Sequence, residues 1–125
     1  MTETLWRLPF PSSNTVGASF QERAGRVCAL TFNEETEEAA INNSLHIVFR
    51  GVEAYKCTYH RACTLAMINL AYDSLVDLGE TEWLTHIREQ LAAYADDLSG
   101  LRHLMIYFDD GPCFEFICRS FQTEA

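Results

Sequence analysis

The pattern of apolar and polar residues predicts strands in the first half of the chain. Apolar and polar residues alternate weakly in Leu5–Phe10, which contains Pro9. Because proline lacks the N–H that a central strand needs for pairing, we expect a short strand at a sheet edge. Residues 11–18 (PSSNTVGA) have loop composition. Val27–Asn33 predicts a longer strand with two distinct faces. One face carries Cys28, Leu30 and Phe32, and the other carries Val27, Ala29 and Thr31.

The next run of β-forming residues, Leu45–Tyr59, is too long for one straight strand. At about 3.4 Å per residue it would reach about 50 Å, which exceeds the width of a domain this small. Gly51 lies near its middle, so we expect either one strand bent at a bulge or two strands joined tightly. The acidic stretch Asn33–Ser44, which precedes this run, is typical of a solvated loop.

Apolar spacings of three and four predict two helices in the second half. The first spans Ala62–Leu78, and Gly79 stands where a helix stop is expected. Thr81 can cap the second helix. Because only Glu80 and Thr81 separate the two, we expect a tight helical corner or an antiparallel pair. The apolar stripe of the second helix consists of Trp83, Ile87, Leu91, Tyr94 and Leu98.

The end of the chain predicts a β-hairpin. Two apolar runs, Leu104–Phe108 and Cys113–Phe121, flank the turn sequence Asp109-Asp110-Gly111-Pro112. The first run is apolar on both faces, as expected for a central strand. Strands, then helices, then a hairpin predict one α+β domain over residues 1–125. We expect an antiparallel sheet of about five to seven strands, with a two-helix layer inserted before the C-terminal hairpin.

Composition narrows the possible functions. The chain has 125 residues, of which 48% are hydrophobic, enough for an ordinary core. Its net charge of −9 argues against nucleic-acid binding and against an anionic membrane surface. No apolar run is long enough to span a membrane, and the first residues lack a basic leader. Five scattered cysteines indicate reduced thiols, so we expect a soluble, cytoplasmic protein.

The spacing Cys-x2-His-x2-Cys places Cys57, His60 and Cys63 within seven residues, a pattern that could bind zinc. The fourth ligand would be Cys113, Cys118 or His103. The alternative is a pair of core thiols beside a surface histidine, which we favour because the apolar content suffices for folding without metal. We therefore expect no metal and no cofactor. A further alternative makes Cys63 a nucleophile in the first turn of a helix, paired with His60.

The turn residues Asp109 and Asp110, with Glu115 on the following strand, form a second candidate group. Clustered carboxylates can hold a hard cation or share acid–base work. Aspartate in a turn normally bonds its own backbone, so we expect turn chemistry here. Tyr55 and Tyr59 are candidate ligand contacts beside the cysteine cluster. The other histidines, His46, His86 and His103, are solitary in sequence.

The chain contains no nucleotide-binding glycine motif, no P-loop, no GxSxG and no HExxH. Abundant aromatic and acidic residues without a catalytic set favour a non-enzymatic protein-binding or regulatory domain of the adaptor or immunity-protein type. The expected partner is a protein with a basic surface, or a second copy of the chain in a homodimer. The alternative is a small-molecule site or enzyme whose cleft lies near His60 and Cys63.

Overall fold

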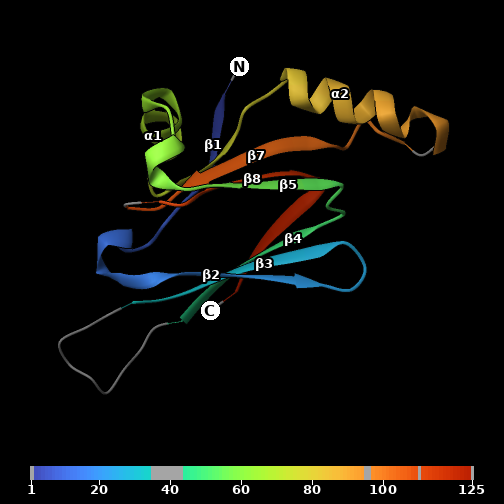
Figure 1. The fold of residues 1–125 in the computed structure, drawn as a ribbon. Coiled ribbons are helices and arrows are strands. Elements are labelled where there is room, and N and C mark those ends of the chain that lie inside the picture. Colours follow the sequence, from blue (N-terminus) through green and yellow to red (C-terminus); the bar gives the residue numbers. More distant parts are fainter. Residues whose placement is uncertain (1, 35–43, 95–96, 110, 125) are drawn as a thin grey trace.

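The fold has three layers: two α-helices, a five-stranded sheet and a four-stranded sheet (Figure 1). The computed structural model describes residues 2–34, 44–94, 97–109 and 111–124, so most of the predicted acidic loop Asn33–Ser44 lies outside the described residues. Every strand pairing within the two sheets is antiparallel, which confirms the α+β class. The described residues form nine strands, more than the five to seven expected in a single sheet.

The five-stranded sheet has the order β1-β6-β7-β8-β5 and the four-stranded sheet has the order β2-β3-β4-β9. In the first sheet the strands are β1 (Glu3–Arg7), β6 (Ser74–Asp77), β7 (Arg102–Tyr107), β8 (Cys113–Cys118) and β5 (Ala54–Thr58). In the second they are β2 (Thr15–Arg23), β3 (Val27–Glu34), β4 (Ser44–Arg50) and β9 (Ser120–Glu124). The helices are α1 (Leu65–Ala71) and α2 (Glu82–Leu91), with 3-10 turns η1 (Ser12–Asn14), η2 (His60–Ala62) and η3 (Ala92–Tyr94). The predicted edge strand and C-terminal hairpin are confirmed as β1 and β7–β8.

The largest hydrophobic core lies between the two sheets. The apolar face predicted for β3, which carries Cys28, Leu30 and Phe32, is buried there. Phe49 of β4 and Phe116 of β8 stack at its centre, with ring centroids 3.9 Å apart and an interplanar angle of 15°. Stacked, fully buried rings add specific attraction to the area they remove from water.

The helices cover the other face of the five-stranded sheet (Figure 1). Under α1, Ala71 packs with Val76 and Met105, and under α2, Leu84 packs with Leu101 and Ile117. β7 is therefore buried on both faces, as predicted for a central strand.

Two apolar runs each cross from one sheet to the other. Leu45–Tyr59 forms two strands, β4 and β5, joined at Gly51, whose φ of 64° lies in the left-handed region. The run Cys113–Phe121, predicted as one strand, divides at Arg119 into β8 and β9. The two crossings lie side by side, since the Arg119 N–H donates to the carbonyl of Arg50 at 3.1 Å.

The helix predicted over Ala62–Leu78 is wrong in its second half. α1 ends at Ala71, Asp73 has a φ of 50°, and Ser74–Asp77 forms β6. Leu75 packs into the core between the sheets, whereas Val76 packs under α1. Consecutive residues point in opposite directions only in a strand, so burial on both faces excludes a helix here. Because β6 separates α1 from α2, the predicted tight helical pair is also wrong.

The loop predicted over residues 11–18 is shorter than expected. β2 begins at Thr15 and pairs with β3, with a register irregularity between Thr15 and Ala18. The strand carries few β-branched or aromatic residues, and its pairing with β3 outweighs that weak local preference. β2 lies at an edge of its sheet, where a polar strand is expected.

The second helix begins where the sequence predicts. Thr81 caps α2, and its side chain accepts a hydrogen bond from the Leu84 N–H at 3.2 Å. The apolar stripe predicted that Trp83 and Leu91 would be buried, but both are only half-buried. The most buried side chain of α2 is Leu84, which the stripe did not include. Leu84 forms a buried cluster with Leu101 and Ile117 beneath the helix.

We expect Leu84→Ala to lower the free energy of unfolding by about 2–5 kcal/mol, because it removes a buried side chain from a packed cluster. Leu91→Ala is the matched control on the same helix and should cost about half as much, since solvent already reaches that side chain. Urea denaturation of both variants measures the difference. Equal losses would contradict the orientation of α2.

Candidate functional site

The predicted cysteine cluster lies where β5 ends and α1 begins. His60 starts η2, and its Nδ1 shares a 2.6 Å hydrogen bond with the hydroxyl of Tyr107, a buried residue of β7. The β7–β8 turn packs directly against it: a Cβ added at Gly111 would lie 2.9 Å from the His60 backbone nitrogen. This close approach and a φ of 72° both require glycine at position 111. The imidazole of His60 is thus oriented by the sheet.

The structure does not bring Cys57, His60 and Cys63 together as a metal site. Cys57 pairs with Phe114 across β5 and β8, and paired residues share a face, so it lies on the side of the sheet that meets the second sheet, exposed at the edge strand β5. Cys63 packs on the opposite face, against the cluster under α1. Within the described residues, no group of three or more histidine, cysteine, aspartate or glutamate side chains is placed to hold a metal ion.

Cys63 differs from the predicted nucleophile in position and in acidity. Thr64 is the N-cap of α1, so Cys63 precedes the helix instead of lying in its first turn. Burial is the main cause that raises the pKa of the Cys63 thiol, which keeps it protonated at neutral pH. His60 is bonded to Tyr107, and the Cys63 Sγ donates weakly, at 3.5 Å, to the carbonyls of Thr58 and Tyr59.

The acidic residues predicted as a second candidate group do not act together in the structure. Asp109 accepts a 2.8 Å hydrogen bond from the Tyr72 hydroxyl, and this bond is the main cause that raises the pKa of Tyr72 to about 12. The Asp109 N–H donates to Ser12 Oγ at 2.7 Å, and Ser12 donates in turn to Asp73. These bonds tie the hairpin turn to the N-terminal arm. Asp110 lies outside the described residues.

Around this junction the chain exposes an unusual run of apolar side chains. Residues 59–72, hereafter the η2–α1 surface, contain no aspartate or glutamate, although the whole chain has 18. Tyr59 is 74% exposed and Leu65 is 72% exposed, followed by Leu70 at 44% and Tyr72 at 43%. Solvated helices normally expose several charged residues, whereas Arg61 is the one Asp, Glu, Lys or Arg in this segment.

Tyr55, the other tyrosine considered as a ligand contact, lies away from the η2–α1 surface. It pairs with Phe116 and so shares the face of the five-stranded sheet that meets the second sheet. Its ring stacks on Phe20 with centroids 4.9 Å apart, and its hydroxyl donates to Glu22 at 3.2 Å. Tyr55 therefore packs between the sheet edges.

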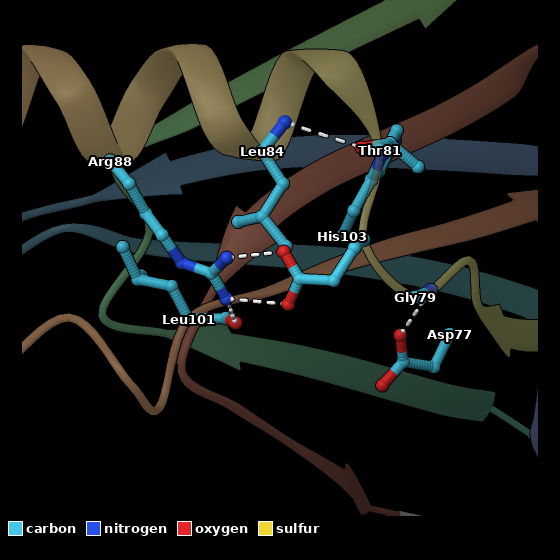
Figure 2. Close-up of polar contacts among 8 residues, drawn as sticks. Asp77, Gly79, Thr81, Leu84, Arg88, Leu101 and His103 are labelled. Carbon is cyan, nitrogen blue, oxygen red and sulfur yellow. Dashed lines mark hydrogen bonds and ion pairs between the residues drawn. The ribbon is translucent and has the colours of Figure 1, made fainter. Parts of the chain in front are cut away.

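A buried polar network under α2 was not anticipated from the sequence. His103 is 4% exposed and Glu115 is 7% exposed, and His103 Nε2 lies 2.9 Å from Glu115 Oε1. The other ring nitrogen of His103 lies 2.7 Å from the hydroxyl of Thr81, which also caps α2 (Figure 2). Trp83 packs edge-on against the imidazole, with centroids 5.0 Å apart. Glu115 thus belongs to this network and not to the acidic turn.

Separate polar contacts lie at both ends of the segment that carries α2. Arg88 forms an ion pair with Glu80 and donates to the carbonyl of Leu101 at 3.4 Å (Figure 2). Asp77 accepts from the N–H of Gly79 at 2.8 Å. With these bonds satisfied, Thr81, His103 and Glu115 fix the helix on the sheet. The sequence carries one sign of this pair: Glu115 is the single charged residue of β8, whose other residues are all apolar.

No protein-family model matches the chain, and no curated protein or solved structure matches it significantly. In the part of the chain that the structure describes, no helix has the length and apolar character needed to cross a membrane.

Proposed function

We propose that the chain is a protein-binding domain and that the η2–α1 surface is its contact surface. One observation carries the proposal: four large apolar side chains are exposed on one acid-free segment of a strongly acidic protein. Interface cores are depleted in charge and enriched in Tyr, Met and Arg, and residues 59–72 contain all three types.

The hydrogen bonds around this surface support the proposal. Tyr72 is held by Asp109 and His60 by Tyr107, while Met67 and Ile68 pack against the cluster beneath α1. A surface that is already ordered loses less conformational entropy on binding. The exposed side chains therefore project from a segment whose other residues are ordered by hydrogen bonds and packing.

The net charge indicates the chemistry of the partner. A second copy would also carry −9, and two such molecules repel each other at long range. A partner with an apolar centre and a basic rim is attracted instead, and its association is faster at low salt. We therefore propose a different protein with a basic surface as the partner, rather than a homodimer.

The test pairs two tyrosines of equal exposure. Tyr59 lies on the proposed surface and Tyr94 lies at the end of α2, and both are 74% exposed. A protein recovered from lysate is purified, and its affinity for the full chain is measured by calorimetry at two salt concentrations. We expect Tyr59→Ala and Leu65→Ala each to weaken binding about ten-fold or more, and Tyr94→Ala to leave it unchanged.

The melting temperatures of these variants should match that of the wild type, because the replaced side chains are mostly in solvent. Equal affinity of the Tyr59 and Tyr94 variants for the purified partner would overturn the proposed surface. Sedimentation that shows a dimer of the chain, lost in Leu65→Ala, would replace the basic partner with a second copy.

A further inference from the structure

A concavity lies at the C-terminal end of α2, beside the point where the chain crosses between the sheets. It has a volume of about 370 Å³. That volume falls within the range of small-molecule sites, which are mostly apolar with a few converging polar groups. The lining residues are Arg26, Glu53, Leu91, Tyr94, Leu98 and Arg119. The apolar part of the lining, Leu91 and Leu98, packs on the cluster beneath α2.

The side chain of Arg119 packs close to two glycines. Its stem lies across Gly51, where an added Cβ would be 2.9 Å from both Cγ and Cδ of the arginine. An added Cβ at Gly100 would lie 3.5 Å from Nη1. The backbone N–H of Arg119 also donates to Arg50 at the crossing. The stem of Arg119 is therefore packed against the backbone at Gly51, and its guanidinium lies beside Gly100.

The two arginines of the pocket differ in their partners. Arg26 forms an ion pair with Glu53, whereas the guanidinium of Arg119 makes no hydrogen bond or ion pair with any other described residue. Asp97 lies nearby, but its carboxylate accepts hydrogen bonds from the N–H and hydroxyl of Ser99 at 3.0 and 2.6 Å. Asp97 remains a charged neighbour of Arg119, so Arg119 is the cation of the described lining that lacks an ion pair but does not give the pocket a surplus of positive charge.

We propose that this pocket binds a small carboxylic acid with an apolar body. The carboxylate pairs with the fork of Arg119, which matches two carboxylate oxygens at once. The apolar body lies against Leu91 and Leu98, and the exposed ring of Tyr94 covers it. One carboxylate pairs with the one guanidinium that has no ion pair among the described residues, whereas a dianionic phosphate would bring a second negative charge close to Glu53 and Asp97.

The experiment compares three probes of the same shape on the full chain: 2-naphthoate, the neutral 2-naphthylmethanol and 2-naphthyl phosphate. Affinities come from calorimetry, and amide chemical shifts of residues 98 and 119 locate the site. We expect 2-naphthoate to bind at least about ten-fold more tightly than the alcohol, because it adds a charge-assisted hydrogen bond. It should also bind more tightly than the phosphate.

Two variants should move the affinity in opposite directions. Arg119→Gln should make naphthoate and the alcohol bind equally, and Glu53→Gln should tighten naphthoate binding because Arg26 is released from its ion pair. Arg7→Gln removes the same charge from an exposed position of β1 and should change nothing. Thermal melts confirm that each variant is folded.

Naphthoate and alcohol binding equally to the wild type would overturn the proposal. So would naphthoate affinity that is unchanged in both Arg119→Gln and Glu53→Gln. Tighter binding of the phosphate would overturn the choice of a carboxylate.

Discussion

Replacing Phe116 with alanine is expected to lower the free energy of unfolding by about 3–5 kcal/mol, because it leaves a cavity at the centre of the core. The ring is fully buried and stacks on Phe49 across the two sheets. Its loss removes the apolar contact at the point where the sheets meet. Chemical denaturation measures the change, and the milder Phe116→Leu serves if the alanine variant does not fold.

Phe20→Ala is the control for this prediction. Phe20 lies in the same aromatic group, with its ring centroid 6.3 Å from that of Phe116, but it is 36% exposed. We expect Phe20→Ala to lower the free energy of unfolding by about 1 kcal/mol, because solvent already reaches the ring. A loss below about 1 kcal/mol for Phe116→Ala would show that the sheets do not pack through this pair.

Glu115→Ala is expected to destabilise the protein by about 1–3 kcal/mol, since it leaves Nε2 of the buried His103 without its hydrogen-bond partner. Glu115→Gln keeps an oxygen acceptor within reach of the imidazole and should cost less. Replacing both His103 and Glu115 with leucine removes both polar groups and should recover part of the loss, because apolar groups of similar shape can replace a buried hydrogen-bonded pair at little cost.

The double-mutant cycle gives the coupling energy of the pair directly. We expect at least about 1 kcal/mol of coupling between His103 and Glu115. Additive losses would show that the two side chains act independently and would contradict the network beneath α2.

Several elements could be predicted from the sequence because their signals are local. The β7–β8 hairpin follows from Gly111, whose positive φ the turn requires. The start of α2 follows from Thr81, whose cap involves a donor only three residues away. The buried face of β3 follows from alternation within the strand. In each case the residues that decide the structure are close neighbours in the chain.

The candidate site was predicted less well, because proximity in sequence does not determine the direction of a side chain. Cys57 and Cys63 are close in sequence, yet they lie on opposite faces of the five-stranded sheet. His60 bonds to Tyr107, which is 47 residues away. Such a partner depends on which strand lies beneath η2, and spacing alone carries no information about it.

The net charge of −9 and the α+β class were determined by the sequence itself, since they follow from residue counts and from local periodicity. The tertiary structure alone decided that Ser74–Asp77 is a strand, because Leu75 and Val76 gain burial on two different faces. It also decided that Glu115 meets His103 and that Arg119 lies in a pocket beside Arg26. These outcomes depend on free energy gained between segments far apart in sequence, which can outweigh the weaker preferences of each segment alone.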